Sequence, residues 1–295
     1  MICKLCGSNN INILCDRPIR DGGIGNYTKE SVKVFQCKHC DVIWHDDYGN
    51  DIEEYYESKS YRSAINGDFK VEDIYKSHDV RVVEKFEQTG THIFRGKVVA
   101  DVGCAVGAFL DFVNGVADTV IGIEPSELFR EVLAEKGYPT YAYVQEAVVD
   151  YKNKIDVITS FDVIEHVDDP ESFLKGIYDL LSEDGCSIIG TPTDAPIMRE
   201  LLGESYEKQI LFNTPHIWIF SEKNLKMLAE KCGFKNIEVK YYQRYGIDNL
   251  LGWLMRNKPQ SDYNASFVTN TLKNVFKGQC EDNKLADFIV LHIKK

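Results

Sequence analysis

The sequence lacks several features that would each have suggested a class of protein. No apolar run approaches the ~20 residues of a transmembrane helix, and the N-terminus shows no signal-peptide pattern. Basic residues are in deficit, because 34 lysines and arginines face 46 aspartates and glutamates, leaving a formal net charge of −12. Nucleic-acid binding draws most of its affinity from basic groups, so this balance argues against a broad nucleic-acid-binding surface. We therefore expect a cytoplasmic protein without a membrane span. The sequence does not indicate its oligomeric state.

The cysteines are numerous for a chain without a secretion signal. All nine are therefore expected to be reduced thiols or metal ligands, not disulfides. Cys3 and Cys6 form one C-x-x-C pair and Cys37 and Cys40 form another, and four thiolates match the S₄ shell of structural zinc. A redox pair would be expected once, beside a βαβ unit, and not twice in a small β-rich segment. The sequence predicts one structural Zn²⁺ held by these four cysteines, with Cys15 as a small core residue.

A short apolar run, an acid, a glycine loop and a helical pattern follow one another in Lys97–Leu110, which reads K-V-V-A-D-V-G-C-A-V-G-A-F-L. This order is typical of a nucleotide-binding corner. The dinucleotide fingerprint needs glycines at three loop positions that here hold Asp101, Gly103 and Val106, so two of the three are missing. The carboxylate of Asp101 would repel a pyrophosphate but suits a ligand with a sulfonium and an ammonium group. The loop therefore indicates a site for S-adenosylmethionine.

A second apolar run, Thr119–Ile123, ends in Glu124. An acid at this position can accept both ribose hydroxyls of an adenosine, although either acid alone could merely cap a strand end. With both acids in this order, the chain resembles the class I S-adenosylmethionine-dependent methyltransferases from about residue 94 onward, and D-x-G-C-x-x-G-x-F is the most specific match. The residues predicted to contact the cofactor are Asp101, Gly103, Cys104, Gly107, Glu124, Phe161 and Asp162.

Apolar runs alternate with helical patterns along the rest of the chain. Further strands are expected at residues 138–144, 154–160, 186–190, 236–242 and 286–293. The alternation predicts an α/β fold with a doubly wound, Rossmann-like, mostly parallel sheet, whose ligands bind beyond the carboxyl ends of the strands. We expect residues 1–60 to form a small zinc-ribbon and an aromatic connector, residues 61–93 a linking helix, and residues 94–295 the methyltransferase domain.

The aromatic connector contains the tyrosine-rich segment Asp51–Tyr56, followed by Tyr61. Its rings could cover a substrate pocket, or they could pack the ribbon on the larger domain. The sequence leaves both interpretations open.

Three later stretches extend the resemblance: F-D-V-I-E-H-V-D-D-P, L-L-S-E-D-G-C-S-I-I-G-T-P and T-P-H-I-W-I-F-S. With the N-terminal cysteines and tyrosines, the chain is similar to zinc-ribbon methyltransferases of sugar-nucleotide and surface-polysaccharide pathways. In the best-known branch, the sugar C-methyltransferases, a His-containing stretch before F-S supplies pocket residues. Here we expect no counterpart of the large extra C-terminal domain of that branch, and its H-E-H stretch is reduced to Thr214-Pro215-His216. The resemblance implies a small-molecule acceptor, a sugar or sugar nucleotide, and the two departures favour methylation on oxygen over methylation on carbon.

Two histidines are expected near the cofactor edge of the sheet. A hydroxyl acceptor benefits from a general base, and the unperturbed pKa of histidine suits that role. We predict His216, on a loop near Trp218 and Phe220, as the base. His166 is a second candidate, although it also fits a purely structural role.

Two other functions remain open at this stage. An RNA methyltransferase could grip its substrate with the ribbon, and it would need a continuous positive face linking Lys4, Lys38 and the cofactor cleft. A non-catalytic scaffold would keep the fold but show an occluded cofactor cleft. The intact glycine loop and Glu124 count against the scaffold.

Overall fold

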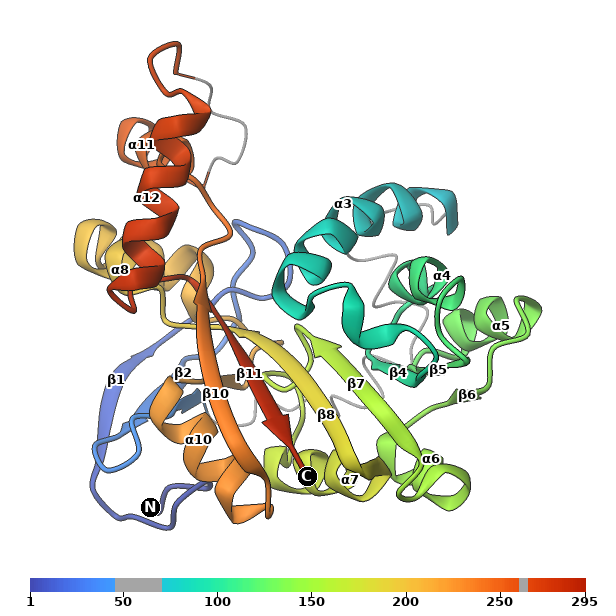
Figure 1. Ribbon diagram of the computed structural model, residues 1–295. Coiled ribbons are helices and arrows are strands. Elements are labelled where there is room, and N and C mark those ends of the chain that lie inside the picture. Colours follow the sequence, from blue (N-terminus) through green and yellow to red (C-terminus); the bar gives the residue numbers. More distant parts are fainter. Residues whose placement is uncertain (46–70, 260–264) are drawn as a thin grey trace. The chain divides into compact units, whose positions relative to one another are not determined.

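The computed structural model describes residues 1–45, 71–259 and 265–295 (Figure 1). The tyrosine-rich segment at residues 51–61 lies outside these residues, so both interpretations of it stay open. The described residues form two compact units. The first falls within Met1–Tyr48, Thr191–Leu225 and Val239–Val290, and the second within Gly49–Gly190, Lys226–Glu238 and Leu291–Lys295.

A seven-stranded sheet runs in the spatial order β10-β11-β8-β7-β4-β5-β6. Its strands are β4 Val98–Val102, β5 Thr119–Ile123, β6 Thr140–Tyr141, β7 Ile155–Phe161, β8 Leu181–Pro192, β10 Lys235–Tyr242 and β11 Phe288–Lys294. Four neighbouring pairs, β4–β5, β5–β6, β4–β7 and β7–β8, are parallel. The predicted α/β fold with a mostly parallel, doubly wound sheet is confirmed.

The central strands are apolar because both of their faces are buried. The last four residues of β4 and of β5 are all buried. The register sets Val102 of β4 opposite Ile123 of β5 and Ser160 of β7, so the carboxyl ends of three strands meet at one edge of the sheet. That edge therefore holds the loop from Gly103, the acid Glu124 and the segment after Phe161.

Helices of the second unit lie on both sides of these strands. They are α3 Val71–Thr89, the short 3₁₀-helix η1 His92–Phe94, α4 Ala108–Asn114, α5 Glu127–Glu135, α6 Val144–Tyr151 and α7 Pro170–Leu180. In Figure 1, α3, α4 and α5 gather on one side of the strands, and α6 and α7 gather on the other. Helix α7 starts at Pro170, as expected, because Asp169 Oδ1 accepts hydrogen bonds from the N–H groups of Glu171 and Ser172. Helix α10, Glu222–Lys231, precedes β10.

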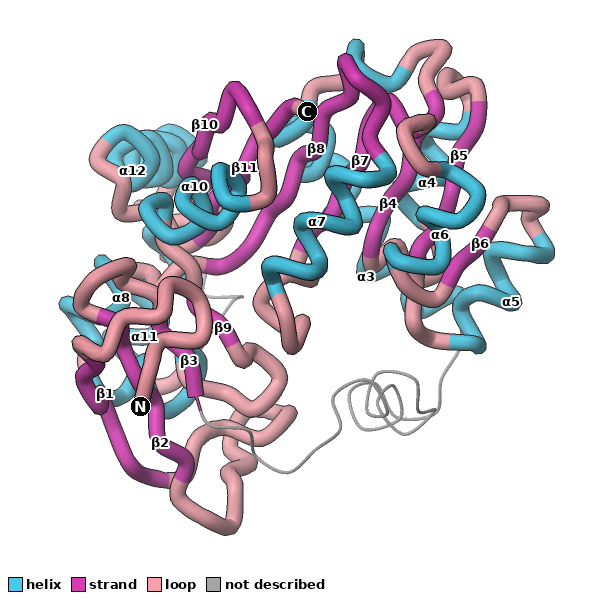
Figure 2. Tube along the Cα trace, turned by 90° about the horizontal axis from the view of Figure 1, so that it is seen from below, coloured by secondary structure: helices cyan, strands magenta, loops and turns pink. Residues whose placement is uncertain are grey.

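The first unit contains an antiparallel sheet of four strands in the order β1-β2-β3-β9 (Figure 2). The strands are β1 Ile11–Arg17, β2 Val32–Cys37, β3 Ile43–His45 and β9 Trp218–Ile219. Strand β9 lies far along the chain from the other three and was not among the strands expected from the sequence. Trp218 pairs with Trp44 and Ile219 with Ile43. The stretch just after His216 is therefore a strand of the N-terminal sheet.

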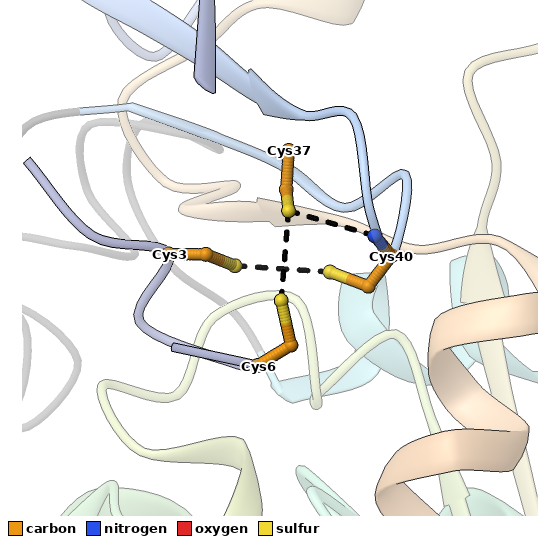
Figure 3. A group of neighbouring side chains, drawn as sticks. All are labelled: Cys3, Cys6, Cys37 and Cys40. Carbon is orange, nitrogen blue, oxygen red and sulfur yellow. Dashed lines mark hydrogen bonds between the residues drawn. The ribbon is translucent and has the colours of Figure 1, made fainter. Parts of the chain in front are cut away.

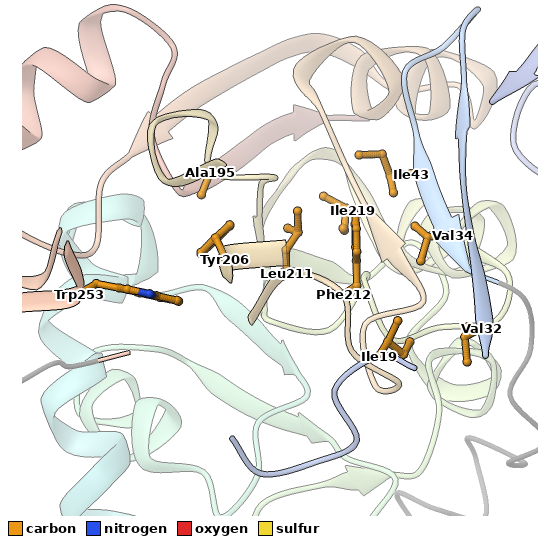
Figure 4. Close-up of a cluster of buried hydrophobic side chains, with 10 residues drawn as sticks. All are labelled: Ile19, Val32, Val34, Ile43, Ala195, Tyr206, Leu211, Phe212, Ile219 and Trp253. Carbon is orange, nitrogen blue, oxygen red and sulfur yellow. The ribbon is translucent and has the colours of Figure 1, made fainter. Parts of the chain in front are cut away.

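Helices complete the described part of this unit. Helix α8 spans Pro196–Leu202, α9 Glu204–Tyr206, the π-helical turn η2 Glu207–Leu211, α11 Ile247–Arg256 and α12 Asn270–Asp282. Their apolar residues and those of the sheet share one core cluster (Figure 4), made of Ile19, Val32, Val34, Ile43, Ala195, Tyr206, Leu211, Phe212, Ile219 and Trp253. Cys15 packs against this cluster, which confirms it as a core residue. Among the described residues, no helix is long and apolar enough to cross a membrane.

Candidate functional site

A cavity of about 330 Å³ opens at the edge of the sheet where β4, β5 and β7 end. Its volume falls within the ~300–1,000 Å³ of small-molecule sites. Apolar and acidic groups line it together. The lining residues are Val102, Gly103, Ile123, Glu124, Pro125, Ser126, Ala142, Tyr143, Val144, Gln145, Asp162, Val163, His166, Val167, Asp168, Asp169, Ser172 and Phe173.

Gly103 is part of the cavity wall and has a positive φ of 75°. A Cβ at this position would fall deep inside the van der Waals contact of Val163 Cγ2. The glycine is therefore needed for the backbone conformation, and the lack of a side chain leaves the backbone open to a ligand. Gly107, at φ 80°, is the residue before α4 and packs under Leu133 instead.

Glu124 lines the same cavity and is held in place by the loops around it. Its Oε2 accepts from the Ala105 N–H at 2.9 Å, and its Oε1 accepts from the Ser126 N–H at 3.0 Å. These two hydrogen bonds fix the orientation of the Glu124 carboxylate on the cavity wall.

Asp101 takes part in an ion pair that the sequence did not predict, and its contact with the cofactor stays a prediction. Its carboxylate is fully buried and lies 3.4 Å from Nζ of Lys85, while Thr159 Oγ1 donates to it at 2.7 Å. The cation beside this acid is thus a lysine of α3, held over the rings of Phe109 and Phe161. Within the part of the chain that the structure describes, Asp101 does not line the cavity.

Of the other residues predicted to contact the cofactor, Asp162 lines the cavity, whereas Cys104 and Phe161 are buried behind it. Asp162 has a positive φ of 56°, a strained conformation for a non-glycine residue that is often retained at functional sites. Its side chain lies 3.8 Å from Arg81. Together with Asp168 and Asp169 it gives the cavity an acidic character, which suits a cationic ligand.

The sequence did not single out several lining residues. Ser126 and the segment 142–145 follow β5 and β6, and Ser172 and Phe173 belong to the first turn of α7. Their position after successive strands of a parallel sheet is the signal that could have found them.

The two candidate bases lie in different units. His166 lines the cavity, and its Nε2 lies 3.8 Å from Oε1 of the buried Glu165. His216 belongs to the first unit, where its N–H donates to Asn213 Oδ1 at 3.1 Å just before β9. A contact of His216 with the cofactor stays a prediction.

The four predicted zinc ligands converge in the first unit (Figure 3). The sulfurs of Cys3 and Cys40 are 3.7 Å apart, those of Cys6 and Cys37 are 3.5 Å apart, and all four lie within 4.8 Å of one another. Sulfurs bound at ~2.3 Å around a tetrahedral zinc would be about 3.8 Å apart. The spacing is consistent with a small zinc-binding module.

Backbone groups favour the thiolate form of one of these ligands. The N–H groups of His39 and Cys40 point at the Cys37 sulfur, at 3.4 and 3.5 Å. Burial raises the pKa of Cys37. These two N–H donors, together with the thiols of Cys6 and Cys40, lower the pKa by more than burial raises it, to about 7. A thiolate is the form that binds a metal.

Two relatives of this chain carry the same name. A ubiquinone biosynthesis O-methyltransferase of Glaesserella parasuis is 29% identical over 188 residues, which cover 59% of this chain and 77% of the relative. One of Haemophilus ducreyi is 30% identical over 179 residues, covering 55% and 74%. Neither name refers to a sugar, so the expected sugar acceptor finds no support in them.

Solved structures share the fold. An S-adenosylmethionine-dependent methyltransferase of Thermotoga maritima matches with a TM-score of 0.53 at 21% identity, over 83% of this chain and 99% of that one. One from Archaeoglobus fulgidus gives 0.50 at 16%, over 75% and 94%. A family model described as a methyltransferase domain matches residues 76–239, which include the cavity but not the four cysteines. The chain therefore belongs to this methyltransferase domain family, and it is an S-adenosylmethionine-dependent methyltransferase.

Proposed function

We propose that this enzyme methylates a hydroxyl oxygen of a small-molecule acceptor. The observation that carries the proposal is the acidic cavity walled by Gly103 at the ends of β4, β5 and β7. The names of the relatives support oxygen as the acceptor atom. Those names favour an acceptor of ubiquinone biosynthesis, and the sequence resemblance favours a sugar or sugar nucleotide.

The cavity residues fit S-adenosylmethionine. Bare backbone at Gly103 permits close approach, Glu124 is oriented to accept from the ribose hydroxyls, and Asp162 adds negative charge for a cationic ligand. When bound, the cofactor supplies a methyl group activated on a sulfonium. The protein's part is to orient donor and acceptor and to exclude water.

A hydroxyl acceptor must lose its proton during the transfer. We infer that a histidine takes this proton, with His216 as the predicted base and His166, on the cavity wall beside Glu165, as the alternative. The carboxylate of Glu165 would stabilise the positive charge that His166 acquires on taking the proton.

The cysteine cluster fits Zn²⁺ held by Cys3, Cys6, Cys37 and Cys40. We propose a structural role, because all four positions would be filled by protein ligands and none would remain for a substrate. The ion would join the N-terminal turn to the turn between β2 and β3.

The test is methyl transfer from S-adenosylmethionine with a tritiated methyl group. The purified protein would be offered a catechol, a nucleoside diphosphate sugar, and RNA. The expected result is a methyl ether on a small molecule. Exclusive labelling of RNA, or a product methylated on carbon or nitrogen, would overturn the proposal. The catechol and sugar arms distinguish the two acceptor classes.

A further inference from the structure

Arg20 differs from the arginines around it in the first unit. Arg17 pairs with Glu204 and Glu207, and Arg199 pairs with Asp194 and Glu207. In the described part of the chain, Arg20 has no carboxylate partner. The guanidinium donates from Nη1 to the carbonyl oxygen of Gly22, and its Nε is buried without an acceptor.

Burying an unpartnered donor of a charged group is unfavourable, because the group loses its hydrogen bonds to water. Burial lowers the pKa of Arg20, and the electrostatic neighbours that act against this are phenols, Tyr206 and Tyr27, and not acids. The group stays charged nevertheless, since an arginine does not deprotonate in proteins. The guanidinium of Arg20 therefore lacks a negatively charged hydrogen-bond acceptor among the described residues.

The surroundings of Arg20 supply further donors. The ammonium of Lys208 lies 5.1 Å from the centre of the Tyr27 ring. The ring of Trp253 is tilted by 56° to that of Tyr206 with ring centres 5.6 Å apart (Figure 4), and its indole N–H is also buried without an acceptor among the described residues. The acids that influence Tyr206 are already engaged, since Asp194 binds Arg199 and Asp287 accepts from Gln243 and Arg244.

The backbone joins this arginine to the loop that carries His216. The Arg20 N–H donates to the Phe212 carbonyl at 3.1 Å, and the Thr214 N–H donates to the Arg20 carbonyl at 3.0 Å. Asp21 Oδ1 accepts from the Thr214 hydroxyl at 2.8 Å. Lys208 lies in η2, and π-helical turns are frequent at functional sites.

We infer that Arg20, with Tyr206, Tyr27 and Lys208, binds an oxyanion carried by the acceptor molecule. A phosphate or a carboxylate fits, because both are acceptor-only groups that match the guanidinium fork. The inference rests on the proposed function for the identity of the ligand as methyl acceptor. It adds that this acceptor is anionic and that its charged group is held by an arginine whose carbonyl accepts from the N–H of Thr214, two residues before His216.

Binding is tested without turnover, with phenyl phosphate and benzoate as probes and benzyl alcohol as the neutral control. Calorimetry on the full chain should show that one of the two anions binds and that benzyl alcohol does not. Arg20→Met should weaken that binding at least tenfold, Arg20→Lys should weaken it less, and Arg95→Met, at an exposed arginine of the second unit, should leave it unchanged. The stronger probe tells phosphate from carboxylate.

A second measurement tests the inference even if the Arg20 variants do not fold. In the unaltered protein, the Nε–H resonance of Arg20 should shift on titration with the anion that binds. Failure of both anions to bind, or an unshifted Arg20 resonance, would overturn the inference. Anion binding through Arg20 without any methyl transfer would leave the subsite standing and refute the proposed reaction instead.

Discussion

Nζ of Lys85 lies 3.4 Å from Oδ2 of Asp101, an acid with no exposed surface at the end of β4. Removing one partner of a buried pair leaves an uncompensated charge. We expect Lys85→Met to lower the free energy of unfolding by about 2–3 kcal/mol, at or below the lower end for buried pairs because Lys85 is partly exposed. The double variant with Asp101→Asn should recover most of this. Urea unfolding measures both.

Lys97→Met is the matched control for this pair. Lys97 lies 3.8 Å from Asp156 and is half exposed, so its loss should change stability by ~0–1 kcal/mol. If the double variant is no more stable than Lys85→Met alone, the pairing is not the reason for the loss.

The strands of the large sheet could be predicted from the sequence because each is a short apolar run before a turn. The run 119–123 coincides with β5, and the run within 97–102 with β4. Strand β9 could not be predicted in this way, because two residues carry no period and their strand state comes from pairing with β3.

The site was predictable to the same extent. Gly103, Glu124 and Asp162 follow strand ends, so local patterns place them at the cavity. The ion pair of Asp101 with Lys85 could not be predicted, because Lys85 lies sixteen residues earlier on a helix and nothing in the local sequence pattern connects the two residues. The convergence of the four cysteines could be predicted from the sequence, because two C-x-x-C pairs supply the four thiolates of a tetrahedral zinc site.

Gly103→Ala should abolish binding of S-adenosylmethionine. The added Cβ meets Val163 and forces a positive φ on alanine, so the free energy of unfolding should also fall by about 1–3 kcal/mol. Gly115→Ala is the control, because Gly115 has φ −69° and open space around it. Calorimetry and thermal unfolding measure the two effects. Ordinary cofactor affinity in Gly103→Ala would refute the close approach.

Glu124→Gln should weaken S-adenosylmethionine binding roughly 10–100-fold, since hydrogen bonds to a charged acceptor contribute ~1.5–3 kcal/mol. Glutamine keeps the shape but only one of the two oxygens that accept from Ala105 and Ser126, so thermal unfolding is measured beside the affinity to detect any loss of stability. The exposed Glu127, three residues on in α5, provides the control Glu127→Gln. An unchanged dissociation constant in Glu124→Gln would remove the ribose assignment.

Freshly purified, reduced protein should contain one zinc ion per chain. Cys37→Ser should lose the ion and unfold the first unit at lower temperature, because zinc binding, about 10–16 kcal/mol in small modules, acts as folding energy. Cys15→Ser is the control, since Cys15 packs against the apolar core of the first unit and is not one of the four clustered cysteines. Metal analysis that finds no zinc in the unaltered protein would contradict the assignment.

The two candidate bases are separated by a pair of matched variants. His216→Asn should lower turnover roughly 10²–10⁴-fold, the usual range for a lost general base, with little change in cofactor affinity. The loop suits the role, because Asn213, itself held by the carbonyls of Ile210 and Leu211, fixes the backbone at His216. His166→Asn should lower turnover less and should disturb cofactor binding more, because His166 lines the cavity.

A third variant, His92→Asn in η1, controls for the loss of any histidine. Single-turnover rates measured across pH decide the assignment, because a histidine base gives a rate that falls as the pH drops below the pKa of its imidazole. That fall should disappear in the variant that lacks the base. If it persists in His216→Asn and disappears in His166→Asn, the base is the histidine beside Glu165, and the prediction for His216 is wrong.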